Sequence, residues 1–255
     1  MKNHVEKFID LIAEIAKGGN RYTVFNDFCK IYATAIANRF DFNQQRENLY
    51  LETVKKYERY LVSKFIDASI ELNLALEDCI GQKVLRLNSP LLEELGLFTD
   101  FPLKCSNPRY KDVLGDIFTE FNMNDGKEGQ VFTPEHICNI MGDLTLYKDF
   151  VDEKLKAKGF ITIVENCCGS GAITLGALNT LIDLGVSPNK QAVVVASDID
   201  ERCVLMSFIQ LSLYGIPAVV LQSNDISDEI FGEPWYTPLF VKDNWLSKFN
   251  WRAAL

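Results

Sequence analysis

Apolar residues recur at helical spacing through the first hundred residues of the chain. The pattern predicts helices over residues 5–16 and 25–37, a longer helical stretch with alternating outward charges over 50–76, and a short helix over 91–95. No β-branched alternation interrupts this region. We therefore predict a helical N-terminal domain at residues 1–105.

The character of the chain changes beyond the prolines at positions 102 and 108. A helical pattern over residues 112–121 runs into a polar, glycine-bearing turn. The segment G-Q-V-F-T-P-E-H-I-C-N-I-M (129–141) then predicts a loop followed by a helix. Pro134 suits the first helical position and Thr133 suits the cap before it.

From residue 160 onward, short β-branched runs alternate with helical patterns. The predicted strands are 160–164, 192–198 and 218–223, and the predicted helices are 172–184 and 201–214. Alternating strands and helices build a parallel sheet, and continuous apolar strands are typical of a sheet that is covered on both faces. We predict an α/β domain of the Rossmann-like kind over residues 106–255.

Composition narrows the class of protein. The chain has 255 residues, 47% of them hydrophobic, which is enough for one sizeable core or for one core and a small appended domain. It contains neither an apolar run of about 18 residues nor a signal-peptide pattern, so we interpret it as cytoplasmic. The seven cysteines form no C-x-x-C and there are only two histidines, so we predict neither a disulfide framework nor a metal site.

The charge argues against a protein that binds nucleic acid unaided. The formal net charge is −9, whereas neutralising phosphates supplies much of the affinity of nucleic-acid binders. If the protein acts on DNA, we expect it to do so with a partner, or through a local basic strip near Lys104, Arg109 and Lys111.

The segment E-N-C-C-G-S-G-A (165–172) joins the first predicted strand to the next helix. Gly169 and Gly171 remove side chains there, so that a ligand can approach the backbone and the helix-start amides. Asp198 ends the next strand, where an acidic residue typically binds ribose hydroxyls. Together they indicate a nucleoside-bearing cofactor, although a simple tight turn is the alternative. Thr174 stands where a nicotinamide fingerprint has its third glycine.

Four blocks in order resemble the adenine-N6 DNA methyltransferases of the type I modification-subunit kind, which use S-adenosylmethionine. They are G-Q-V-F-T-P-E-H-I-C-N-I-M, E-N-C-C-G-S-G, S-D-I-D-E-R-C and V-V-L-Q-S-N-D-I. The resemblance spans residues 112–226 and implies a Rossmann-like methyltransferase core behind the helical domain. The chain leaves room for about one strand after the third. The sheet is thus expected to be incomplete, either in a short plasmid- or phage-type member or in a truncated chain.

Carried over by position, the resemblance assigns cofactor-binding roles to residues of each block. Phe132, Thr133 and Pro134 would border the methionine part, while Glu165, with Asn166 and Cys168 in the same loop, would lie near its amino group. Gly169 and Gly171 would allow the close approach. Asp198, followed by Ile199, would bind the ribose, Asp225 would bind the adenine amine, and Ile226 would pack on the adenine ring.

The family's catalytic tetrapeptide, asparagine or aspartate followed by two prolines and an aromatic residue, is missing from this sequence. The nearest candidate is Glu233-Pro234-Trp235-Tyr236. The segment before it, residues 226–232, offers too little apolar sequence for a buried strand. The alternative is that these aromatic residues, with Leu239, Phe240 and Trp245, cover the exposed edge of the sheet.

Two functions therefore remain open. One is a DNA adenine-N6 methyltransferase of a restriction-modification or mobile-element system, completed by another chain such as a specificity subunit. The other is a catalytically inactive partner or regulator that binds S-adenosylmethionine. Methylation of a small molecule or a protein is a third possibility that the first block disfavours.

Overall fold

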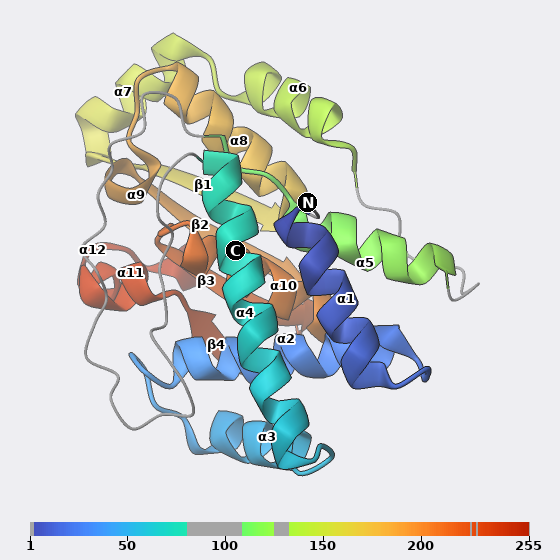
Figure 1. The fold of residues 1–255 in the computed structure, drawn as a ribbon. Helices are drawn as coiled ribbons and strands as arrows, with labels where there is room; N and C mark the ends of the chain where they lie inside the picture. The colour runs from blue at the N-terminus through green and yellow to red at the C-terminus, as the bar shows by residue number, and fades with distance from the viewer. Residues whose placement is uncertain (1–2, 81–108, 125–132, 225, 228, 255) are drawn as a thin grey trace.

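A single sheet lies at the centre of the part of the chain that the structure describes. The computed structural model describes residues 3–80, 109–124, 133–224, 226–227 and 229–254 (Figure 1). Within them the strand order is β1-β2-β3-β4. β1 (Ile161–Asn166), β2 (Ala192–Asp198) and β3 (Ala218–Asn224) are parallel, and β4 (Glu229–Tyr236) runs antiparallel to β3. The three predicted strands and their parallel pairing are confirmed.

β4 corrects one prediction. Residues 226–232 were expected to be too poor in apolar residues for a buried strand, yet Glu229–Tyr236 forms a strand. β4 lies at the edge of the sheet and its first five residues are exposed or half-buried. An antiparallel edge strand needs no continuous apolar run, because only part of its surface meets the core. β4 is the further strand for which the chain had room.

Alternate residues of the strands pack against two different layers. On one face, Val194, Ala196 and Val220 join the core that includes α8 (Ala172–Asp183) and α10 (Glu201–Leu213). On the other face, four β2 and β3 side chains pack against the C-terminal segment, which contains α11 (Pro238–Lys242), α12 (Trp245–Lys248) and a 3-10 turn at Trp251–Ala253. Those four are Val193, Val195, Val219 and Leu221. The short α9 (Pro188–Gln191) leads into β2.

The aromatic residues near the C-terminus therefore divide between two roles. Trp235 and Tyr236 cover the edge of β3 by pairing with it, as the alternative predicted. Phe240 and Trp245 instead cover a face of the sheet, because they belong to the cluster with Val193 and Val195. The expectation that they cover the edge is corrected on this point.

Four helices form the N-terminal layer of the described residues: α1 (His4–Ala16), α2 (Arg21–Ala37), α3 (Gln44–Val54) and α4 (Arg59–Ile80). The single helical stretch predicted over 50–76 is wrong, since α3 and α4 are separated by a turn. That turn is held by the buried Asp27 of α2, which accepts hydrogen bonds from Lys56 Nζ at 2.9 Å and Tyr57 Oη at 2.7 Å. The short helix predicted at 91–95 lies outside the described residues.

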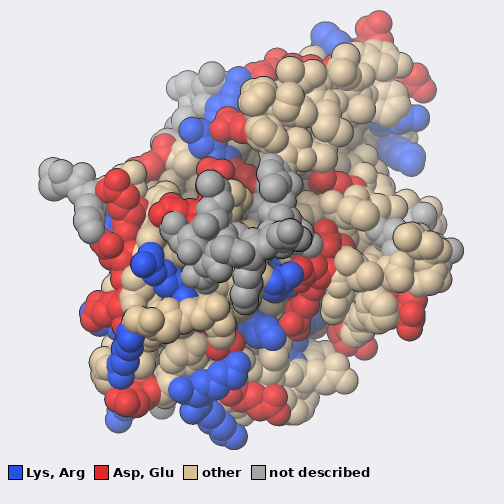
Figure 2. All heavy atoms as spheres, turned by 90° about the vertical axis from the view of Figure 1, so that its right-hand side faces the viewer, with Lys and Arg blue, Asp and Glu red and all other residues tan. Residues whose placement is uncertain are grey.

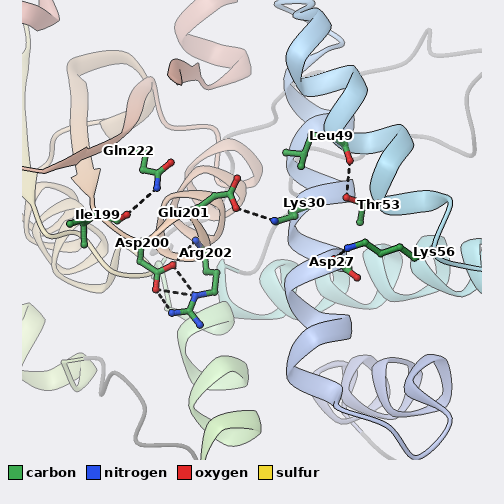
Figure 3. A network of polar contacts seen from close by, with 10 residues as sticks. All are labelled: Asp27, Lys30, Leu49, Thr53, Lys56, Ile199, Asp200, Glu201, Arg202 and Gln222. Carbon is green, nitrogen blue, oxygen red and sulfur yellow. Dashed lines mark hydrogen bonds and ion pairs between the residues drawn. The ribbon is translucent and has the colours of Figure 1, made fainter. Parts of the chain in front are cut away.

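The N-terminal layer packs directly on the helices of the sheet. Lys30 of α2 pairs with Glu201 at the start of α10, with 3.0 Å between Nζ and Oε2 (Figure 3). The neighbouring Arg202 places its guanidinium over the rings of Tyr22 and Phe118. One continuous cluster of buried side chains runs from Phe8 in α1 to the core of the sheet. The boundary at residues 105 and 106 lies outside the described residues and stays a prediction.

In the described ranges 109–124 and 133–158, three further helices precede β1: α5 (Val113–Asn124), α6 (Glu135–Thr145) and α7 (Lys148–Lys158). α6 begins at Glu135 with Pro134 as its N-cap residue, and no side chain caps it. The expectation that Thr133 caps this helix is therefore wrong: Pro134, expected at the first helical position, occupies the cap position instead, and the helix begins one residue later than predicted.

Across the described ranges, every helix is too short or too polar to cross a lipid bilayer.

Candidate functional site

The loop between β1 and α8 turns sharply through three residues with positive φ. These are Cys167 (φ 61°), Gly169 (φ 55°) and Gly171 (φ 98°). The Cys168 amide donates to the Ser197 carbonyl at 2.8 Å, and the Gly171 amide donates to the Cys168 carbonyl at 2.8 Å. The loop is thereby tied to the end of β2, and its backbone is bare of side chains at both glycines. The arrows of β1 to β3 in Figure 1 point toward the side that Figure 2 faces.

Asp198 lies beside this loop, as predicted from its place at the end of β2. Its carboxylate accepts hydrogen bonds from the Gly169 amide at 2.8 Å and from the Asp200 amide at 2.9 Å. Only 7% of the residue is exposed. Since a carboxylate oxygen can accept more than one hydrogen bond, both oxygens keep capacity for a further donor.

Exposed apolar side chains flank the carboxyl ends of β2 and β3. Ile199 is 59% exposed and Ile226 is 99% exposed. The Ile199 carbonyl accepts from Gln222 Nε2 at 3.0 Å, which holds the turn after β2 against β3 (Figure 3). An apolar side chain that faces water at a ligand-binding edge suits a flat ring. Phe132 and Asp225 lie outside the described residues.

Glu165 is buried at the end of β1, next to the start of α8. It accepts a hydrogen bond from the Thr174 hydroxyl. Its pKa is raised to about 7, chiefly by burial and to a smaller extent by the nearby carboxylates Asp112 and Asp198, whereas hydrogen bonds from Thr174 oppose the shift. Asn166 is exposed, and its side-chain oxygen lies 3.5 Å from the Ser197 hydroxyl. Cys168 is buried and its pKa is raised well above the usual value by burial, so it is a packing residue rather than a nucleophile.

A cavity of about 300 Å³ opens between the starts of α5, α6 and α8. Thr133 and Pro134 line it, together with Ala172 and Leu175 of α8 and the carboxylate of Asp112. The first predicted block therefore meets the helix that follows the glycine loop. The close approach of α6 and α8 depends on glycine, because a Cβ at Gly176 would lie 2.5 Å from the backbone carbonyl of Cys138.

The tetrapeptide at 233–236 is not brought to this loop. In β4, Trp235 pairs with Val220 and Tyr236 with Val219, which places both near the amino end of β3. Trp235 is buried against Phe208, and the Arg46 guanidinium lies over its ring, 4.8 Å from the centroid. Arg46 also donates to the Pro234 carbonyl. These contacts support packing as the role of the tetrapeptide.

Sequence reasoning missed three polar residues that support the loop: Asp112, Ser170 and Gln210, which are joined by hydrogen bonds. The sequence held a signal for Asp112 alone, since an aspartate directly before a helical pattern is a typical cap. In the described part of the chain, no group of three or more potential ligands is arranged to hold a metal ion.

Comparison with known proteins places this arrangement in a family. A family model described as N-6 DNA methylase matches residues 109–237, about half of the chain, and takes in α5 to β4. The chain belongs to the N-6 DNA methylase family. Enzymes of this family transfer a methyl group from S-adenosylmethionine, so S-adenosylmethionine is the cofactor to expect in this methylase fold.

Two solved structures are similar to this methylase chain. One is assigned to the class I S-adenosylmethionine-dependent methyltransferases and comes from Listeria monocytogenes, with 12% identity, a TM-score of 0.41 and coverage of 94% of this chain and 68% of that one. The other is the type I restriction-modification system methyltransferase subunit from Streptococcus thermophilus, with 15% identity and a TM-score of 0.33. That match covers 88% of this chain and 57% of the subunit. No curated protein matches the chain.

Proposed function

We propose that this chain binds S-adenosylmethionine at the carboxyl ends of β1 to β3 and takes part in adenine-N6 methylation of DNA. The observation that carries the proposal is the contact between the Asp198 carboxylate and the Gly169 amide, 2.8 Å from N to O. It joins an acidic residue with free acceptor capacity to a turn with two glycines, which is the arrangement that binds a nucleoside in doubly wound sheets.

The residues present fit this cofactor. Asp198 would accept hydrogen bonds from the ribose hydroxyls, and the exposed Ile199 and Ile226 would pack against adenine. Glu165 would balance the charge of the amino group once its carboxyl group is ionised. Thr133 and Pro134, with Phe132 before them, would border the methionine part at the start of α6. Asp225 would hold the adenine amine.

Each protein group has a limited task in this proposal. The cofactor, when bound, supplies an activated methyl group, and the chain binds and orients it. The backbone at Gly169 and Gly171, which carries no side chain, would allow the close approach of the cofactor. The base pocket is a separate requirement, because methylation of adenine in a duplex needs the base to be flipped out of the stack.

Calorimetric titration with S-adenosylhomocysteine tests the binding proposal. We expect the wild-type protein to bind and Asp198→Ala to bind at least tenfold more weakly, because the ribose hydroxyls lose their acceptor. Asp149→Asn, an exposed carboxylate change on α7, is the matched control and should bind as the wild type does. Absence of heat with the wild-type protein at high micromolar ligand would refute the site, and an unchanged Asp198→Ala affinity would remove Asp198 from it.

DNA as substrate and a partner subunit belong to the same proposal. The formal net charge is −9, and on the face that Figure 2 shows, acidic and basic side chains are mixed rather than gathered into one basic surface. Arg109, predicted as part of a basic strip, pairs with Asp183 at 2.6 Å, and Lys104 lies outside the described residues. We therefore assign contact with DNA mainly to a partner, because phosphate neutralisation needs positive charge.

Such a partner would extend the sheet at the outer edge of β1. Among the described residues nothing pairs with the outer edge of β1, and Val164 is 43% exposed, whereas every residue of β2 is buried. α6 lies at the same end of the molecule (Figure 1) and exposes an apolar stripe formed by Ile137, Ile140, Met141 and Leu144. The occupant we propose is a strand-bearing segment of a partner subunit, because a strand would pair with the free backbone groups at the edge of β1 and the same segment would cover the stripe on α6.

The alternative is a binding protein without catalysis, and the missing Asn/Asp-Pro-Pro-aromatic tetrapeptide favours it for the chain by itself. Tritiated methyl transfer to unmodified DNA separates the two functions. Transfer that requires a partner subunit supports the split enzyme. Binding of the cofactor without methyl transfer, whether the chain is alone or combined with candidate partner subunits, supports the regulator.

A further inference from the structure

Asp112 touches the glycine loop from a part of the chain that precedes it by more than fifty residues. It stands directly before α5, and its carboxylate accepts hydrogen bonds from the Ser170 hydroxyl, from Gln210 Nε2 at 2.8 Å and from the Gly115 amide at 2.9 Å. Loss of water raises the pKa of Asp112, while its three hydrogen-bond donors oppose the shift. Three donors that converge on one carboxylate define its orientation as well as its position.

Gln210 of α10 completes the contact from the other side. Its Nε2 donates both to Asp112 and to the Ser170 carbonyl, the latter at 2.9 Å, and its Oε1 accepts from the Leu114 amide at 3.1 Å. Ser170 is fully buried between the two loop glycines. Both its hydroxyl and its carbonyl are therefore held, so that the rotation of this peptide is restricted in the part of the loop where glycine allows the most freedom.

On the side of α5, the contact leaves no room for a side chain at Gly115. A Cβ at Gly115 would lie 2.6 Å from the Ser170 hydroxyl oxygen and would also collide with the Asp112 carboxylate. Asp112 further lines the cavity that Thr133 and Pro134 border. Asp112 thus binds the loop through Ser170 and lines the same cavity as the start of α6.

We propose that Asp112 is a positioning residue which, together with Gln210, holds Ser170 and thereby keeps the Gly169–Gly171 turn in the conformation that receives the cofactor. The inference rests on the proposed function. It adds that α5 and α10 contribute to the preorganisation of this loop, beyond the loop's own glycines and its hydrogen bonds to the end of β2. Apolar packing would fill the same space, but it would not orient the Ser170 peptide.

The test compares Asp112→Ala with Asp27→Ala in titrations with S-adenosylhomocysteine. Asp27 is the matched control, because it is a buried carboxylate with two hydrogen-bond donors located in the N-terminal layer. We expect Asp112→Ala to lower affinity about tenfold or more, whereas Asp27→Ala lowers the melting temperature and leaves affinity unchanged. Ser170→Ala should weaken binding as well, and the double variant Asp112→Ala/Ser170→Ala should lose little more than either single variant.

The outcomes separate this inference from the proposed function. If the wild-type protein binds, Asp198→Ala weakens binding and Asp112→Ala binds like the wild type, the positioning role is wrong and the site stands. Additive losses in the double variant would also overturn it, since independent contacts add. If Asp112→Ala does not fold, Gln210→Ala carries the same comparison, and wild-type affinity in that variant contradicts the proposal.

Discussion

Glu165 connects the burial of one side chain to a pH dependence. Its pKa is raised from 4.5 to about 7 in the folded chain. Because the folded pKa exceeds the unfolded one, its stabilising effect is complete below pH 4.5 and is lost as the pH rises through 7. At pH 8 the buried carboxylate costs about 3 kcal/mol of the free energy of unfolding. Glu165→Gln should therefore melt at a higher temperature than the wild type at pH 8 and at a similar one at pH 4.5.

For ligand binding we expect the opposite pH dependence: ionisation of Glu165 lowers the stability of the fold but raises the affinity for the cofactor. If ionised Glu165 balances the cofactor's amino group, the affinity of the wild-type protein for S-adenosylhomocysteine rises between pH 6 and 8, and Glu165→Gln binds more weakly and without that rise. Thermal unfolding and calorimetry at matched pH values provide both measurements. An identical pH profile in the variant would mean that another group produces it.

The contact between α6 and α8 is a feature of two elements rather than of one residue. Gly176 faces the Cys138 backbone so closely that Gly176→Ala must push the helices apart, since a carbonyl cannot move aside as a flexible side chain would. We expect a loss of about 1–3 kcal/mol in the free energy of unfolding and weaker binding, because Thr133 and Pro134 move with the start of α6. Thr145→Ala, at the exposed end of α6, is the control and should change neither. Full stability in Gly176→Ala would contradict the close packing.

Elements whose cause is local were predictable, and those that depend on distant contacts were not. β1 to β3 and the intervening helices follow from apolar runs and from glycine stops, which the sequence displays directly. The turn between α3 and α4 contains neither glycine nor proline and depends on Asp27 of α2.

In the site, Gly169 and Asp198 were predicted because each stands at a strand end. The Asp112–Ser170–Gln210 contact joins residues 58 and 40 positions apart, which no local pattern reveals.

At the scale of the whole molecule, the helical layer and the sheet share one core, whereas the outer edge of β1 pairs with no other strand among the described residues. The N-terminal helices cover α10, and the C-terminal segment covers the opposite face of β2 and β3. Among the described residues, neither pairs with the outer edge of β1 or covers the stripe on α6, whose apolar side chains stay exposed. We expect the side with the unpaired edge of β1 and the exposed stripe on α6 to be the surface that associates with another chain.

The double variant Ile140→Glu/Leu144→Glu tests this side of the molecule. Both side chains are more than half exposed, so the fold and the affinity for S-adenosylhomocysteine should be unchanged, while two buried charges would oppose docking. We expect the variant to lose methyl transfer that depends on a partner subunit, and to lose co-elution with that subunit in size-exclusion chromatography. Glu153→Gln/Lys156→Gln on α7 is the control with an unaltered stripe. If the α6 variant associates with the partner subunit as the wild type does, the partner binds elsewhere. If the wild-type chain self-associates without any partner present and the variant does not, the occupant is a second copy of the chain.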